Sequence, residues 1–175
     1  PTFAASPEKS RHAGSGDGVA VAHDSLAAWV QQVFQAPLLA RQPVGGGCIH
    51  RAWQLQLADG RRFFAKTNGA AALPMLQAEA AGLQALAAAA DADLVVPRPL
   101  HCALVEGEAL MVLPWLTLVH GGTSQAWSDF GAGLARLHRR SAADQPQRFG
   151  WSHDNFIGTN PQRNGWQDRW GRFFA

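Results

Sequence analysis

The chain has 175 residues, 47% hydrophobic and 16% charged, a balance typical of a globular domain or part of one rather than of a disordered protein. A formal net charge of +2, with arginines scattered among apolar segments, does not indicate a nucleic-acid partner. No apolar run approaches the roughly 20 residues that span a bilayer, residues 1–18 lack a signal-peptide core, and the two cysteines form no disulfide framework or zinc spacing. We therefore expect a cytoplasmic protein that binds no membrane.

Residues 1–22 contain Ser, Gly, Ala and Pro without periodicity, and we expect them to form a disordered leader. A first helix should follow the leader, because Asp24 or Ser25 can cap it and Pro37 stops it. Its predicted apolar face recurs at helical spacing and comprises Leu26, Trp29, Val30, Val33 and Phe34.

A run of glycines precedes a predicted β-hairpin. Apolar side chains alternate over residues 53–57, the dipeptide Asp59-Gly60 favours a tight turn, and an apolar strand then leads to Lys66. Glycines between two strands let the backbone bring N–H groups close to phosphates, although a bare glycine run is more often only a flexible turn. The run comprises Gly45, Gly46 and Gly47.

Lys66 stands out because the chain has 13 arginines but only two lysines, and the other one, Lys9, lies in the leader. An ammonium group is a compact point charge, unlike the planar guanidinium, so we infer that position 66 requires it. The alternative is a lysine at a strand edge whose ammonium group simply reaches water.

Residues 73–90 are rich in Ala and Leu, with Pro74 in the first turn, which predicts a helix. Glu79 falls within an apolar stripe of this helix, where a carboxylate needs a partner because burying an unpaired charge costs free energy. We predict that Glu79 pairs with Lys66; the alternative is a slightly different helical register that leaves Glu79 in solvent. The other members of the stripe are Met75, Gly82, Leu83 and Leu86.

Two apolar runs, 100–105 and 109–113, flank a Glu-Gly-Glu turn and predict a second hairpin. A further helix should begin at Thr123 or Ser124. Residues 149–175 carry many aromatic side chains with little core of their own, so we expect a neighbouring surface to cover them. The apolar face predicted for the further helix comprises Trp127, Phe130, Leu134 and Leu137.

These features follow the order of the nucleotide-binding half of a protein-kinase-like fold: glycine loop, strand lysine, helix glutamate, then an apolar strand and a short connector. In this interpretation Lys66, held by Glu79, contacts the α- and β-phosphates of ATP, and the glycine loop covers them. The connector forms the hinge beside adenine, with its N–H donor from Trp115 or Leu116 because Pro114 has none. The predicted fold class is α+β, with an antiparallel sheet plus helices.

Six segments carry a more specific signature, namely GGGCIHRAWQLQLADGRRFFAKTN, LPMLQAEAAGLQAL, VPRPL, LMVLPWL, FGAGLARLH and FGWSHDNFIGTNPQRNGWQDRWGRFF. From about Val44 to Ala175 the chain thereby resembles the fructosamine (ketosamine) kinase family. The resemblance implies phosphorylation of the 3-hydroxyl of ketosamines, free or on glycated proteins, with ATP and Mg²⁺, on a fold related to aminoglycoside phosphotransferases. It also implies a nucleotide-binding N-lobe with hinge over residues 23–116 and the start of a helical C-lobe over residues 117–175.

By the same resemblance, Asp154 and Asn155 lie beside the sugar-binding side of the cleft, without an assigned contact. A kinase also needs an Asp base and Mg²⁺ ligands, which the family places in an HGD-type loop and a later Asp, and the sequence contains neither motif. His153-Asp154-Asn155 does not replace them, because kinase loops place Asn five residues after Asp, where this chain has Thr159. We therefore expect the catalytic residues and metal ligands downstream of Ala175, and a fragment that is inactive alone.

Two rival functions remain open: a catalytically inactive kinase-fold protein that binds nucleotide or a partner, and an aminoglycoside-type small-molecule kinase. Cys48 lies in the predicted phosphate loop, where backbone N–H groups and nearby cations would acidify its thiol. Because some members of the resembled family carry a cysteine in this loop, Cys48 is a redox candidate that would link a disulfide-bonded dimer. A passive small residue in a monomer is the equal alternative.

Overall fold

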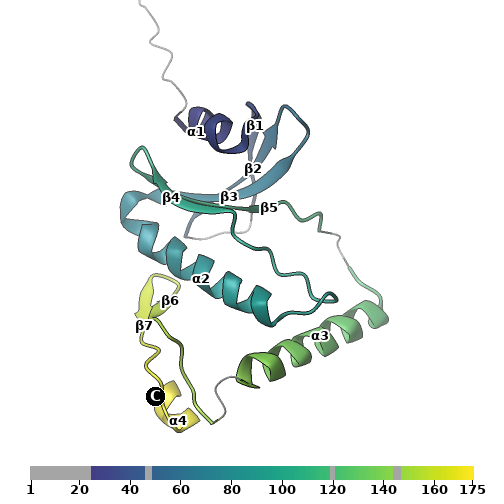
Figure 1. The fold of residues 1–175 in the computed structure, drawn as a ribbon, viewed down its shortest axis with the longest axis vertical. Helices are drawn as coiled ribbons and strands as arrows, with labels where there is room; N and C mark the ends of the chain where they lie inside the picture. Colours follow the sequence, from purple (N-terminus) through teal and green to yellow (C-terminus); the bar gives the residue numbers. More distant parts are fainter. Residues whose placement is uncertain (1–24, 46–48, 119–120, 144–146) are drawn as a thin grey trace, which may run out of the picture.

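The computed structural model describes residues 25–45, 49–118, 121–143 and 147–175, so the predicted leader and the residues Gly46, Gly47 and Cys48 lie outside the described part. The described chain forms a five-stranded antiparallel sheet between helices α1 (Ser25–Phe34) and α2 (Leu73–Ala89), and helix α3 (Ser124–Ala143) and a small hairpin lie beside α2 (Figure 1). The strand order is β1-β2-β3-β5-β4. The strands are β1 (Leu38–Pro43), β2 (Arg51–Leu57), β3 (Arg62–Gly69), β4 (His101–Val105) and β5 (Glu108–Pro114).

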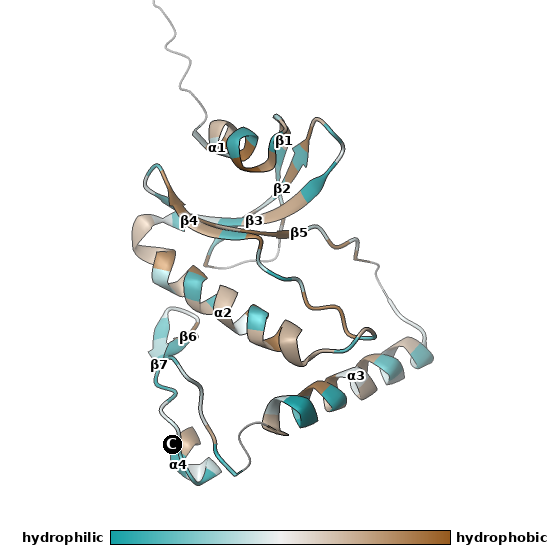
Figure 2. Ribbon diagram, viewed as in Figure 1, coloured by the Kyte–Doolittle hydropathy of each residue, from teal (hydrophilic) through white to brown (hydrophobic). Residues whose placement is uncertain are grey.

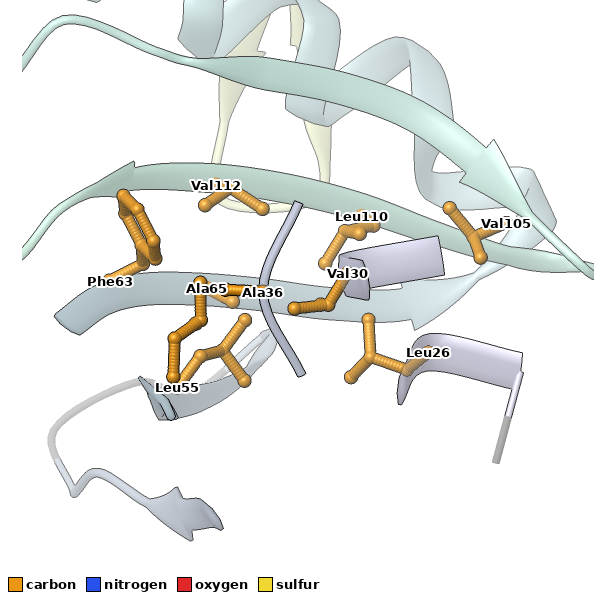
Figure 3. Packing of buried hydrophobic residues seen from close by; sticks show 10 residues of the cluster. Leu26, Val30, Ala36, Leu55, Phe63, Ala65, Val105, Leu110 and Val112 are labelled. Atoms are coloured by element: carbon orange, nitrogen blue, oxygen red, sulfur yellow. The ribbon is translucent and has the colours of Figure 1, made fainter. Parts of the chain in front are cut away.

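Helix α1 (Ser25–Phe34) covers one face of the sheet, as its apolar pattern predicts. Val30 is fully buried in one cluster with Leu55 of β2, Ala65 of β3 and Val112 of β5 (Figure 3). Each fully buried aliphatic side chain of this size contributes about 1.5–3 kcal/mol through the hydrophobic effect. This cluster therefore holds α1 on the sheet.

The two predicted hairpins are both present, joining β2 to β3 and β4 to β5. Gly60 has a φ of 86°, a left-handed conformation that glycine adopts without a steric penalty. The Asp59 carboxylate accepts the backbone N–H of Arg61 at 3.0 Å and completes the turn. Strand β1 was not among the predicted elements, because it lies at the sheet edge with mostly exposed side chains and so lacks an apolar alternation.

Helix α2 (Leu73–Ala89) packs against the opposite face of the sheet. Leu76 and Ala80 of the helix form a second cluster with Met111 and Leu113 of β5. Figure 2 shows the strongly hydrophobic character of β5, and its residues from Ala109 to Leu113 are all buried. Helices cover both faces of this strand, so neither of its faces meets solvent.

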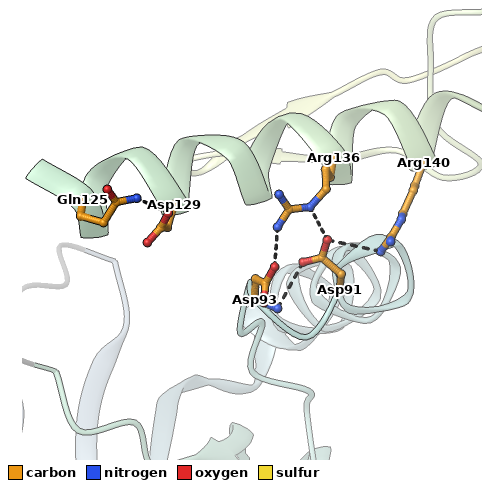
Figure 4. Close-up of polar contacts among 6 residues, drawn as sticks. All are labelled: Asp91, Asp93, Gln125, Asp129, Arg136 and Arg140. Carbon is orange, nitrogen blue, oxygen red and sulfur yellow. Dashed lines mark hydrogen bonds and ion pairs between the residues drawn. The ribbon is translucent and has the colours of Figure 1, made fainter.

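Helix α3 (Ser124–Ala143) is joined by ion pairs to the segment that directly follows α2 (Figure 4). Arg136 Nε lies 2.6 Å from Asp91 Oδ2, and another nitrogen of the same guanidinium lies 2.8 Å from Asp93 Oδ2. Arg140 adds a longer contact of 3.7 Å to Asp91. One guanidinium thus bridges two carboxylates that follow α2, and this fixes α3 relative to α2.

Thr123 caps α3, because its hydroxyl oxygen accepts the backbone N–H of Ala126 at 3.1 Å. Thr123 is one of the two caps that the sequence suggested. On the predicted apolar face, Leu137 is buried, whereas Trp127 and Phe130 are 65% and 50% exposed. The helix is correctly predicted, and the described residues cover only part of its apolar face.

Residues 147–175 form the hairpin of β6 (Asn155–Ile157) and β7 (Asn160–Gln162), followed by the short helix α4 (Trp170–Phe174). The hairpin lies beside α2 (Figure 1). Trp170 stacks on Phe174 with ring centroids 5.5 Å apart, yet the two side chains are 55% and 76% exposed. Within this described segment no apolar side chain is buried, as its composition predicted. No helix in the described ranges has the length and apolar character needed to cross a membrane.

Candidate functional site

Lys66 and Glu79 form an ion pair between β3 and α2. The alternation of β3 buries Ala65 in the core below α1 and turns Lys66 toward α2. Lys66 Nζ lies 2.5 Å from Glu79 Oε1, and the two side chains are 27% and 32% exposed. The predicted pairing is therefore confirmed, and both alternatives, an unpaired strand-edge lysine and a solvated glutamate, are wrong.

The pair lies in the wall of an open cleft of about 710 Å³. The walls come from Gly45 and the chain leading into β2, from β2 and β3, from α2, and from the β6–β7 hairpin. All five residues of the predicted α2 stripe line this cleft. The stripe around Glu79 thus faces a cavity rather than the sheet, since Leu76 and Ala80 make the main contact with the sheet.

The end of the glycine loop is fastened to β3 by Asn68. The Asn68 amide nitrogen donates to the carbonyl of Ile49 at 2.9 Å and lies 3.0 Å from Nδ1 of His50. The Asn68 side-chain oxygen accepts the N–H of Gly69 at 2.8 Å. Both Ile49 and His50 line the cleft, so Asn68 holds one rim of the cleft in place.

His50 is the third titratable side chain of the described cleft wall, beside Lys66 and Glu79. Burial and the neighbouring Lys66 ammonium lower the pKa of His50, and the Glu79 carboxylate opposes them more weakly. Sequence reasoning missed both His50 and Asn68. Asn68 could have been found from the alternation of side chains along a strand, because it follows Lys66 by two positions and so lies on the same face of β3.

The residues predicted for the hinge do not line this cleft. Pro114 ends β5 opposite Phe63, and the Trp115 ring lies 5.9 Å from the Arg62 guanidinium carbon. Of the remaining nucleotide-site predictions, Gly45, Lys66 and Glu79 come together at the cleft, whereas Gly46, Gly47 and Cys48 lie outside the described residues.

Asp154 and Asn155 are organised by Asn164, which sequence reasoning also missed. Asp154 Oδ1 accepts the backbone N–H of Asn164 at 2.8 Å. The Asn164 amide nitrogen donates to the carbonyl of His153 at 3.0 Å and to Asn155 Oδ1 at 2.9 Å. Asn164 is only 3% exposed, so it joins both ends of the hairpin as a buried polar link. Asn155 reaches the cleft wall, whereas Asp154 does not line the cleft.

The Mg²⁺ used by kinases takes carboxylate or amide oxygens of the protein as ligands. Over the described ranges, His, Cys, Asp and Glu side chains form no group of three or more that could hold a metal ion. The polar groups of the cleft are instead a cation, its paired carboxylate, an imidazole and an amide. These groups suit an anionic ligand with hydrogen-bonding groups better than a metal ion.

Two solved structures share this fold. A candidate fructosamine-3-kinase from Haemophilus somnus superposes with a TM-score of 0.71 at 22% identity, covering 85% of this chain and 49% of that one. A second candidate fructosamine-3-kinase, from Thermobifida fusca, superposes with a TM-score of 0.66 at 24% identity, covering 86% and 50%. The kinase-like α+β fold predicted from the sequence is therefore confirmed.

Curated relatives carry related names. A probable ketoamine kinase of Synechocystis is 41% identical over 136 residues, which are 77% of this chain and 43% of the relative. A probable ketoamine kinase of Escherichia coli is 34% identical over 145 residues, or 83% and 48%. A chloroplastic protein-ribulosamine 3-kinase of Arabidopsis thaliana is 31% identical over 159 residues, or 89% and 46%. This chain spans about half the length of these relatives.

The sequence profile of the fructosamine kinase family matches residues 22–175, which is most of the chain. The match includes the strand lysine, the helix glutamate and the β6–β7 hairpin that meet at the cleft. This chain therefore belongs to the fructosamine kinase family.

Proposed function

We propose that this chain is the nucleotide-binding part of an ATP-dependent ketosamine 3-kinase. The observation that carries the proposal is the Lys66–Glu79 ion pair in the wall of a cleft that also includes Gly45. A lysine held by a helix glutamate is the arrangement with which kinase folds bind the α- and β-phosphates of ATP. The family of ketoamine kinases to which the chain belongs supports the same assignment.

Each polar group then has one task in binding ATP. The Lys66 ammonium contacts the phosphates, and Glu79 fixes its position so that little side-chain entropy is lost on binding. We assign the phosphates also to the glycine run, of which Gly45 is the described residue at the cleft wall. The Trp115 or Leu116 backbone N–H lies outside the described cleft lining, and we assign it to adenine, as a hinge between an N-lobe at residues 23–116 and a C-lobe that starts at residue 117.

The substrate assignment is a ketosamine, free or on a glycated protein, phosphorylated at its sugar 3-hydroxyl. Asn155 is the described residue best placed to meet it, because Asn155 lines the cleft from the β6–β7 hairpin. Asp154 is assigned to holding that hairpin, since its carboxylate accepts the Asn164 N–H. We assign the Asp base and the Mg²⁺ ligands of phosphoryl transfer to no described residue, and place them in the half of the longer relatives that this chain does not match.

Calorimetric titration of ATP·Mg²⁺ into the chain tests the nucleotide site directly. Lys66→Met should weaken binding at least ten-fold, because it removes a charge-assisted contact to phosphate. Arg163→Met removes an exposed positive charge outside the cleft and should bind ATP like the unmodified chain. Equal affinities of the Lys66→Met variant and the unmodified chain would contradict the assignment.

The same preparation, supplied with ATP·Mg²⁺ and a fructosamine, tests the catalytic proposal. We expect ATP binding without turnover by the 175-residue chain, and turnover by a protein that also contains the second half of the relatives. Turnover by the chain alone would contradict the assignment of the catalytic groups elsewhere. Phosphorylation of an aminoglycoside but not of a fructosamine would instead support an aminoglycoside-type kinase.

A further inference from the structure

The orientation of the Asn68 amide is determined by two backbone groups. Its nitrogen lies 2.9 Å from the Ile49 carbonyl, which only accepts hydrogen bonds, and its oxygen lies 2.8 Å from the Gly69 N–H, which only donates. Exchanging the nitrogen and oxygen would place two acceptors together at Ile49 and two donors together at Gly69. The group that faces His50 Nδ1 at 3.0 Å is therefore the Asn68 NH₂ group, a donor.

This donor determines where the neutral His50 ring carries its proton. A neutral imidazole has one N–H and one bare nitrogen, and the nitrogen facing a donor must be the bare one. Nδ1 of His50 therefore accepts from Asn68, and the ring proton sits on Nε2. Because both the nitrogen and the oxygen of the Asn68 amide are hydrogen-bonded to backbone groups, Asn68 on β3 determines the tautomer of the neutral His50 ring.

His50 shares the described cleft wall with two charged side chains, Lys66 and Glu79. The Glu79 carboxylate already pairs with Lys66 at 2.5 Å. Burial and the Lys66 charge lower the pKa of His50, which favours a neutral ring at pH 7. A neutral N–H beside an ammonium group lets an anion gain a second hydrogen bond without a second cation repelling the first.

We propose that His50 is a second phosphate-binding residue of the cleft, donating its Nε2–H to the ligand beside the Lys66 ammonium, and that Asn68 is the residue that positions it. The proposal rests on the nucleotide site proposed above and adds a specific donor to it. It identifies the recognised chemistry as the polyphosphate of the nucleotide rather than its base or sugar.

Two substitutions of His50 separate a donor at Nε2 from a merely structural ring. Glutamine places its amide nitrogen near the Nε2 position of histidine, whereas asparagine reaches only the Nδ1 position. We expect His50→Asn to weaken binding of inorganic tripolyphosphate and of ATP about ten-fold or more, as for a lost hydrogen bond to a charged group, and His50→Gln to restore most of the affinity. Adenosine should bind all three proteins equally. His138→Asn on the exposed face of α3 is the matched control and should leave the affinities for tripolyphosphate, ATP and adenosine unchanged.

Nitrogen-15 NMR of the imidazole gives a readout that is independent of affinity. The neutral His50 ring should carry its proton on Nε2 in the free chain, and Asn68→Ala should produce a mixture of tautomers. A proton on Nδ1 in the free chain would overturn the proposal. So would unchanged tripolyphosphate binding by His50→Asn in a chain whose Lys66→Met variant loses binding, and that result would leave the nucleotide site itself intact. Failure of the unmodified chain to bind tripolyphosphate and ATP would overturn both.

Discussion

The rotational setting of α2 decides whether Glu79 meets Lys66, and two Leu→Ala substitutions on this helix test it. Leu76 is fully buried between α2 and β5, whereas Leu86, ten residues later on the same helix, is 45% exposed at the cleft. Both changes alter helix propensity by the same small amount, so the difference between them reports burial alone.

Leu76→Ala should lower the free energy of unfolding by about 2–5 kcal/mol, because it removes buried methyl groups and leaves a cavity in the packed cluster with Met111. Leu86→Ala should cost less than half as much, since nearly half of that side chain is already in water. Urea denaturation followed by circular dichroism measures both values, with an unchanged slope against urea as the sign of an intact native fold.

Equal costs for the two substitutions, or a larger cost for Leu86→Ala, would refute the described setting of the helix. In that case the face that carries Glu79 would pack on the sheet, and Glu79 would no longer line the cleft. The stability experiment therefore also tests the geometry on which the nucleotide site depends, without using any ligand.

Three further predictions concern other parts of the molecule. Hydrogen bonding to Arg136 holds the pKa of Asp91 below its usual value, so this pair stabilises the fold above about pH 4. The stabilisation is lost as the pH falls through the pKa of folded Asp91. The melting temperature should therefore fall less between pH 7 and pH 3 in Arg136→Ala than in the unmodified chain. Burial, with a contribution from the Glu79 charge, raises the pKa of the Cys102 thiol, so alkylation followed by mass spectrometry at pH 8 should be slower than for free cysteine, and equal rates would contradict this. Asn164→Ala removes the two hydrogen bonds that the side-chain amide nitrogen donates at a site that is 3% exposed, and it should destabilise the hairpin by about 1–3 kcal/mol, seen as faster proteolysis within β6–β7. Cleavage at wild-type rates would show that the buried link is dispensable.

Local patterns in the sequence were enough to predict most elements and their order. The Asp59-Gly60 turn fixes the first hairpin because glycine tolerates the left-handed φ of 86°. The Ala- and Leu-rich run with Pro74 in its first turn predicts α2 within one residue of its observed end. The pairing of Lys66 with Glu79 was also predictable, since a charge placed within an apolar pattern needs a partner.

Only the tertiary structure decided which face of each element meets which neighbour. The apolar stripe around Glu79 lines a cleft instead of packing on the sheet. Strand β1 has only a weak apolar pattern, and it forms because β2 offers an edge with which it can pair. The contacts that support the cleft rims, Asn68 to His50 and Asn164 to Asn155, join residues 18 and nine positions apart. Hydrogen bonds between side chains depend on orientation and distance within the folded chain, which composition and periodicity do not encode. The sequence by itself thus determined most of the elements, the family resemblance and the central ion pair, while the fold determined the cleft and the amides that shape it.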